Sequence, residues 1–502
     1  MICDLTEELP LPSVPILKTS MTASFYFHGP IFRFGLAAVV WWLVLVPLGL
    51  QAADDVSPAA SPVADEFLIR DVPKPVLFYG DDATAERMFT TLIETYTLTR
   101  FPSWKLTFRN TGWEGDKILL GDRSATRDQA IRRDIESLRP QVVLVNYGMN
   151  DARDGEAGYA QFLTRLNILS RDLPRVGVYR AAFISPNPAE GYEQGMPAGS
   201  RDNVILQKYS DGMKERFPIG WQDGVASVLA HPKGSEVPTP QNGIYIDLLT
   251  PMIHFIEAGR EANALSRDNA PGDKTVRLMP DGVHPNWMGH FMMAALILQG
   301  LHAPDLVSSA TLDAARSATT SAQGCAITWQ NAPAGVVQFQ RNDDALPWPV
   351  PPEADPALKI PGFDPATTLN RYDLKVSGLK GAFYKLSIDG REIGAYSQAD
   401  LATGVNLGFV RQGPIYDQGQ KLLAAVIEKN ETFFNRWRNV QVGQQSPPGM
   451  NAADMRKAEM AHSDQVKPEL VRLDKVIADE EQAIDVLRQP VAHVFKLEPV
   501  GK

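Results

Sequence analysis

The chain has 502 residues, of which 44% are hydrophobic and 22% charged, and its formal net charge is −10. This composition excludes a mainly disordered, collagenous or coiled-coil chain, and the length predicts two or three folded units. The lack of a basic excess argues against nucleic acid as a partner. Two cysteines, Cys3 and Cys325, are too few for a disulfide scaffold or a four-cysteine zinc site.

An uncharged apolar run at residues 35–50 is the first distinct feature of the chain. It is shorter than the roughly 20 residues that a membrane-spanning helix needs, and Arg33 precedes it, as in a signal peptide. We therefore expect residues 1–53 to be a signal peptide, with an uncleaved anchor as the alternative, and residues 54–71 to be a flexible leader. The prediction is an exported protein, periplasmic or extracellular, that touches a membrane only if this N-terminal segment is retained.

Residues 72–305 alternate between short apolar runs and amphipathic stretches. This alternation is typical of a parallel sheet covered by helices on both faces, so we predict one three-layer α/β/α domain. The strand-like runs are residues 76–79, 106–109, 142–147, 176–184 and 244–248. The helix-like stretches are residues 84–99, 126–138, 157–172, 202–216, 251–264 and 286–300.

Three further regions follow this domain. Residues 306–370 are rich in Ala, Ser, Thr and Pro and are predicted to be an irregular connection. Residues 371–412 are predicted to form a small antiparallel β unit, because alternating runs flank an Asp389-Gly390 hairpin turn. Residues 413–502 are predicted to be a helical C-terminal segment that packs on the chain itself, with a partner-binding scaffold as the alternative.

Polar residues and glycines stand together at the ends of three predicted strands and before the last α/β helix. The carboxyl ends of parallel strands share one edge of the sheet, and ligands bind at that edge. Each segment alone is a weak signal, because glycine turns and Asn-Asp helix caps are common. The four segments are Gly80-Asp81-Asp82, Trp113-Glu114-Gly115-Asp116, Gly148-Met149-Asn150-Asp151 and Asp281-Gly282-Val283-His284.

In this order and spacing, the four segments resemble the motifs of the SGNH, or GDSL-type, ester hydrolases: a GDS block, a later Gly, a GxND block and a DxxH block. The resemblance covers about residues 74–300. It implies a flavodoxin-like α/β/α fold and hydrolysis of small-molecule or carbohydrate esters, acetyl esters among them, without a cofactor. The C-terminal regions resemble extensions of exported bacterial members of this family.

The resemblance also implies roles for individual residues. His284 corresponds to the catalytic base and Asp281 to the carboxylate that orients it. Gly115, Asn150 and the backbone N–H of Asp82 correspond to the oxyanion hole. Asp82 stands where the family has its nucleophilic serine. A carboxylate that attacked an ester would form an unstable anhydride and would place negative charge beside the developing oxyanion, so this replacement leaves catalysis in doubt.

Several interpretations of Asp82 stay open at this point. Asp82 could attack an alkyl carbon instead of an acyl carbon, or Ser124 could supply the missing hydroxyl. A hard cation could bind to Asp82, Asn150 and His284, although no ligand spacing specifies a metal and we predict none. Alternatively, Asp82 pairs with a protonated His284, and the cleft is a catalytically inactive module that binds glycans or acylated ligands.

Other residues near the motifs are assigned more ordinary roles. His254 and His290 lie in helical stretches and are interpreted as helix-face residues. Trp113 and Trp287 flank the motif loops, where they either pack in the core or stack on sugar rings. The long polar loop over 217–242 covers either the site or the opposite side of the sheet.

Overall fold

The computed structural model describes residues 67–69, 74–119, 127–190, 199–217, 243–265, 276–443 and 452–500. The expected signal peptide, most of the expected leader, Ser124 and the loop over 218–242 lie outside these ranges. Residues 67–69, expected to belong to the flexible leader, are buried instead, because the apolar side chains of Phe67, Leu68 and Ile69 join the core of the α/β layers. Every helix in the described ranges is too short or too polar to cross a membrane.

A five-stranded parallel sheet forms the centre of the α/β region, with the strand order β2-β1-β3-β4-β5. This is the order of flavodoxin-like sheets, so the predicted fold class is confirmed. The strands are β1 (Val76–Gly80), β2 (Phe108–Asn110), β3 (Val142–Asn146), β4 (Arg180–Ile184) and β5 (Gly243–Ile246).

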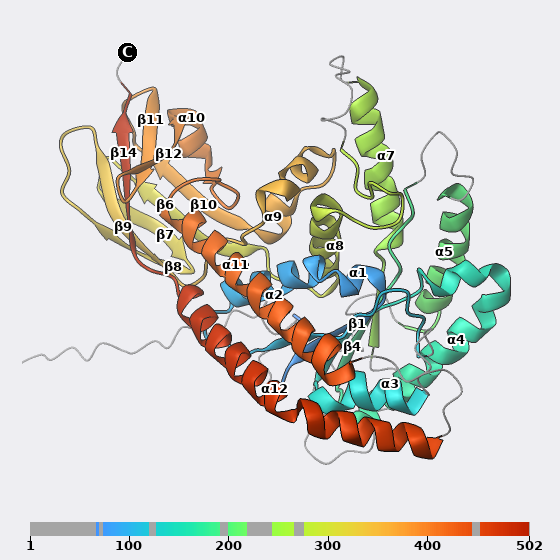
Figure 1. Cartoon of the computed structure of the whole chain (residues 1–502). Helices are drawn as coiled ribbons and strands as arrows, with labels where there is room; N and C mark the ends of the chain where they lie inside the picture. The colour runs from blue at the N-terminus through green and yellow to red at the C-terminus, as the bar shows by residue number, and fades with distance from the viewer. Residues whose placement is uncertain are drawn as a thin grey trace, which may run out of the picture. The chain divides into compact units, whose positions relative to one another are not determined.

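Helices cover both faces of this sheet and give three layers (Figure 1). Side chains alternate along β1: Val76 and Phe78 join one apolar core, and Leu77 and Tyr79 join the other. The first core is completed by α2 (Met88–Arg100), α7 (Leu249–Leu265) and α8 (Trp287–Gly300). The second is completed by α3 (Arg127–Asp134), α4 (Gly155–Asp172) and α5 (Gly199–Lys214).

Two smaller sheets follow the α/β layers and share one apolar core. One has the order β13-β10-β6-β7 with a parallel β6–β10 pair, and the other is antiparallel with the order β12-β11-β14-β9-β8. Their strands are β6 (Leu306–Asp313), β7 (Ala318–Gln323), β8 (Cys325–Trp329), β9 (Val337–Asp343), β10 (Arg371–Ser377), β11 (Phe383–Ile388), β12 (Arg391–Ser397), β13 (Val405–Asn406) and β14 (His493–Pro499). Two short helices, α9 (Pro365–Leu369) and α10 (Gln398–Thr403), lie among them in sequence.

Two sequence-based expectations for this region are corrected. Residues 306–370 are not an irregular connection, because they contain four strands; β7 is almost wholly exposed, so its polar composition hid it. Residues 413–502 are not entirely helical, because β14 lies between β9 and β11. The hairpin turn is present as predicted, with φ of 50° at Asp389 and 77° at Gly390.

The C-terminal helices pack against the α/β layers. The segment contains α11 (Pro414–Phe434), a π-helix (Asn435–Val442) and α12 (Ala452–Leu487). Helix α11 lies beside α2 (Figure 1), and its Leu422 and Val426 are part of the same apolar core as β1. This packing carries the end of α11 to the edge of the sheet where the motifs lie.

Candidate active site

The first motif forms a tight turn between β1 and the short helix α1 (Asp82–Ala85). A Cβ at position 80 would lie 2.1 Å from Thr84 Oγ1 and 2.3 Å from the Asn146 carbonyl oxygen, so only glycine fits. The turn therefore places Asp82 directly at the carboxyl end of β1.

The carboxylate of Asp82 accepts hydrogen bonds from two groups expected to form the oxyanion hole. The Gly115 N–H donates to Oδ1 at 3.2 Å, and the Asn150 side-chain amide donates to Oδ2. Gly115 has a φ of +73°, in the left-handed region that favours glycine. Both donors therefore point at the Asp82 side chain itself.

Asp281 and His284 form a second part of the site, in the loop before α8. Asp281 Oδ2 lies 2.6 Å from His284 Nδ1, and its Oδ1 accepts the backbone N–H groups of Val283 and His284 at 2.9 and 2.8 Å. Although partial burial opposes the effect, the bonds from His284 and these N–H groups lower the pKa of Asp281 to about 2. Asp281 is thus an ionised acceptor that fixes the His284 ring.

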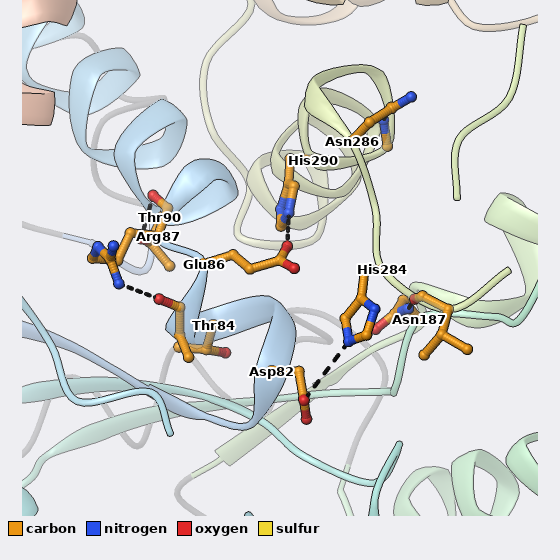
Figure 2. Close-up of polar contacts among 12 residues, drawn as sticks. Asp82, Thr84, Glu86, Arg87, Thr90, Asn187, His284, Asn286 and His290 are labelled. Carbon is orange, nitrogen blue, oxygen red and sulfur yellow. Dashed lines mark hydrogen bonds and ion pairs between the residues drawn. The ribbon is translucent and has the colours of Figure 1, made fainter. Parts of the chain in front are cut away.

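His284 and Asp82 face each other across a short gap (Figure 2). His284 Nε2 lies 3.8 Å from Asp82 Oδ1, which is close enough for charge attraction but too long for a hydrogen bond. Burial acts to lower the pKa of His284, but the bond and charge of Asp281, with the charges of Glu86 and Asp82, raise it overall. The structure brings all five predicted site residues together, and their chemical roles stay predictions.

Further acidic groups lie beneath the site. Burial, with the charges of Asp82, Asp151 and Asp116, raises the pKa of Asp81 well above its usual value. Burial also raises the pKa of Asp151 to about 7, despite a hydrogen bond from the Ile118 N–H. Both carboxyls are therefore shifted toward the neutral form relative to an exposed aspartate, which reduces the negative charge behind Asp82.

Asp82 and His284 line a cleft of about 790 Å³. One wall comes from α1 and the motif loops, and the other comes from the C-terminal segment. The lining residues are Asp82, Ala85, Glu86, Arg87, Gly112, Trp113, Glu114, His284, Phe434, Arg438 and Asn439. The helical segment after residue 413 is thus part of the site, which the sequence motifs did not indicate.

Trp113 packs in the wall of this cleft and leaves little ring surface for a sugar. It is 6% exposed, with the Arg438 guanidinium 3.4 Å above its ring and the Trp437 ring at 5.8 Å, edge to face. Trp437 and Arg438 belong to the π-helix, a conformation often found at functional sites. Of the two interpretations of Trp113, core packing therefore fits the structure.

Glu86, Arg87 and His290 form a group that the sequence analysis did not connect to the site. Glu86 Oε2 lies 2.5 Å from Nε2 of the fully buried His290 (Figure 2). Arg87 has a φ of +66°, which separates α1 from α2 inside the expected helix 84–99. Its side chain pairs with Glu431 at 2.9 Å and lies over the Phe434 ring. No local pattern could reveal these contacts, because their partners are some 200 to 350 residues away.

A metal ion has no evident place in the described part of the chain. Within those residues, no group of three or more His, Cys, Asp or Glu side chains is arranged so that it could hold one. The suggested cation ligands Asp82 and Asn150 are instead hydrogen-bonded to each other.

Comparison with known proteins identifies similar folds. No family model and no curated protein matches this sequence. A solved gut microbial diltiazem-metabolizing enzyme aligns over 85% of this chain and 98% of its own, with a TM-score of 0.62 and 21% identity. An acetylxylan esterase from Geobacillus stearothermophilus (TM-score 0.31, 16% identity) and a lipase/acylhydrolase from Enterococcus faecalis (0.30, 16%) each align over 46% of this chain and 94% and 95% of their own. The first likeness shows a shared fold, and its extent includes elements beyond the α/β layers.

Proposed function

We propose that this protein is an exported SGNH-type relative of ester hydrolases whose cleft binds an acyl-ester or glycan ligand without cleaving it. The observation that carries this proposal is the position of the Asp82 carboxylate, which engages both Gly115 N–H and the Asn150 amide. In serine catalysis these donors would stabilise the oxyanion of the tetrahedral intermediate. Here they already bind a negative group of the chain itself.

Two further features oppose the serine reaction. The raised pKa of His284 favours the imidazolium, which cannot accept a proton from a nucleophile. The nearby hydroxyl of Thr84 is buried and directed at Gly80, since a Cβ there would meet its Oγ1. Thr84 is therefore a poor substitute for the missing serine.

A second candidate function, ester hydrolysis by this same site, is favoured by the Asp281–His284 pair. Its 2.6 Å contact and its place at the cleft are what a catalytic base requires. In that case His284 would activate water, or Asp82 would attack the alkyl carbon of an ester.

Hydrolysis of p-nitrophenyl acetate by the full chain separates the two candidates. We expect background rates for the native protein and a gain of at least about 100-fold in Asp82→Ser, because a hydroxyl is restored and two oxyanion donors are released. The double variant Asp82→Ser/His284→Ala should return to background. Asp211→Ser, an exposed position on α5, controls for the substitution itself.

Each outcome decides between the candidates. Native hydrolysis that is lost in His284→Ala would overturn the binding proposal in favour of catalysis. An inactive but folded Asp82→Ser would contradict the roles given to Gly115, Asn150 and His284.

A further inference from the structure

The loop that carries Asp281 and His284 is held by two sets of bonds. The first set lies within the loop and fixes its shape: Asp281 accepts the backbone N–H groups of Val283 and His284 and lies 2.6 Å from the His284 ring. Because these bonds connect loop residues only to one another, they do not decide where the loop lies relative to Asp82. The position of His284 in the cleft therefore depends on a second set of bonds, which connects the loop to other elements.

The segment after β4 supplies such bonds through Glu190, which is only 4% exposed. Its Oε2 accepts the backbone N–H of Leu278 at 2.9 Å and that of Met279 at 2.7 Å. Its own backbone N–H donates to the Gly282 carbonyl oxygen at 2.8 Å. One buried residue thus binds the loop through three hydrogen bonds, two of them before Asp281 and one directly after it.

Further contacts fix the segment after β4 itself. Asn203 of α5 donates to the Ala189 carbonyl oxygen and accepts the Ala189 N–H, both at 2.8 Å. The amide of the buried Asn187 donates to the Val283 carbonyl oxygen at 3.3 Å, so Asn187 lies next to the loop of His284 (Figure 2). The segment is therefore fixed to α5 on one side and to the loop on the other.

The other end of the loop is fixed to α8. Asn286 caps this helix by accepting the Gly289 N–H at 3.1 Å, and its backbone N–H donates to the Leu278 carbonyl oxygen at 2.9 Å. The helix approaches this closely because residue 289 is a glycine: a Cβ there would lie 2.7 Å from the Leu278 carbonyl oxygen. The loop is thus held from two sides, and we expect loss of the Glu190 side chain to shift the loop without unfolding it.

We infer that Glu190 is a positioning residue, whose buried carboxylate holds the loop so that the His284 ring faces Asp82 across the cleft. His284 Nε2 lies 3.8 Å from Asp82 Oδ1, and a displacement of about 1 Å is enough to change what such a pair can do. The inference rests on the proposed function for the use of this arrangement, since Asp82 and His284 both line the ligand cleft. In a hydrolase the same placement would control proton transfer.

The test replaces Asp82 by a thiol, whose ionisation reports how near His284 lies. In Asp82→Cys, an imidazolium that faces the sulfur should lower the thiol pKa by about one pH unit or more from its ordinary value of about 8.5. The pH dependence of alkylation by iodoacetamide measures this pKa on the full chain. Alkylation is followed on the peptide that contains residue 82, so that Cys3 and Cys325 do not contribute. Adding His284→Ala should raise the thiol pKa.

Adding Glu190→Ala to Asp82→Cys should raise the thiol pKa by at least about half a pH unit, because the released loop moves the imidazolium away. Glu190→Gln keeps an oxygen that can accept both N–H groups, so it should leave the thiol pKa near the value in Asp82→Cys. The matched control Asn370→Ala removes another buried side chain that accepts a backbone N–H, that of Trp348, and should also leave it unchanged. If Glu190→Ala does not fold, Glu190→Asp, which is too short to reach both N–H groups, takes its place.

A double-mutant cycle shows whether Glu190 acts through His284. Once His284→Ala is present, adding Glu190→Ala should change the thiol pKa by less than about 0.2 pH unit, whereas a merely structural role would give the same change in both backgrounds. Equal changes in the two backgrounds, or no change on adding Glu190→Ala or His284→Ala to Asp82→Cys, would overturn the inference. The titration needs neither a ligand nor turnover, so failure of this inference is distinguishable from failure of the proposed function.

Discussion

The α2–α11 contact and the cleft differ in the groups that donate hydrogen bonds to their buried carboxylates. At the contact, the buried Glu94 accepts Lys429 Nζ at 2.7 and 2.9 Å and the Asn430 amide at 3.0 Å. In the cleft, Asp82 has two uncharged donors, and the nearest imidazole nitrogen recorded is 3.8 Å away. One carboxylate is matched by a full opposite charge, whereas the other is held by dipoles.

This difference separates a structural role from a functional one. Burial raises the pKa of Glu94 and lowers that of Lys429, and each partner's charge opposes the shift in the other. The pair therefore depends on both members being present. Asp82 borders a cleft and is held by two uncharged donors, so we expect its removal to cost little stability and to change the chemistry of the cleft instead.

The largest effect on stability should come from breaking the buried pair. Lys429→Met leaves the buried Glu94 without its hydrogen-bonded cation, and we expect the free energy of unfolding to fall by about 3–5 kcal/mol. Urea unfolding of the full chain measures it. The double variant Glu94→Leu/Lys429→Met should recover most of the loss. A loss below about 1 kcal/mol in Lys429→Met would contradict the structural role given to the Glu94–Lys429 pair.

An intermediate effect is expected at Asp151, whose carboxylate is buried and whose ion pair with Arg165, at 3.9 Å, is longer than the 2.7 Å pair between Lys429 and Glu94. Its folded pKa of about 7 exceeds the unfolded value of 3.8, so the folded state binds the extra proton and stability falls as pH rises from about 4 to 7. The loss has an upper limit of about 4 kcal/mol.

Asp151→Asn should remove this part of the pH dependence, because the side chain stays neutral. Unfolding free energies at pH 4.5 and 7.5 check this, with the native chain compared at both values. Equal pH slopes in the two proteins would show instead that Asp151 is ionised in the folded state at both pH values.

The smallest effect is expected on the surface of α12. Lys475 Nζ lies 3.1 Å from Asp479 Oδ2, but both side chains are more than 60% exposed. Lys475→Ala should change the free energy of unfolding by less than about 0.5 kcal/mol, measured under the same urea conditions. A loss as large as that of Lys429→Met would show that burial does not decide the difference.

The site residues that lie near strand ends could be predicted from the sequence, whereas those brought in by tertiary packing could not. Asp82, Gly115 and Asn150 each lie within a few residues of a strand end, and parallel strand ends meet at one edge, so local motifs were sufficient to predict their proximity. Phe434 and Arg438 reach the cleft through the packing of α11 and the π-helix on the α/β layers and on α12, which no motif encodes. Glu86 belongs to none of the four motif segments, and its connection to His290 depends on a tertiary contact across 204 residues.

The fold was predictable to a similar extent. Buried strands of the α/β layers are short apolar runs, whereas β7 is polar and exposed. The alternation of buried and half-buried residues in β14 is a readable strand signal. Its two neighbours β9 and β11, however, lie more than 100 residues earlier in the chain, so the sequence could not reveal its central place.

That central place of β14 has a consequence for biosynthesis. The ribosome makes the β8–β9 and β11–β12 hairpins well before residues 493–499. Until β14 has been synthesised, the backbone groups of β9 and β11 that pair with it have no strand partner there. Such edges are prone to pair with other chains. Folding of this sheet therefore requires the seven-residue β14 to insert between β9 and β11 after both have been synthesised. We expect a bulky fusion placed directly after β14 to slow this insertion and to lower the yield of folded protein.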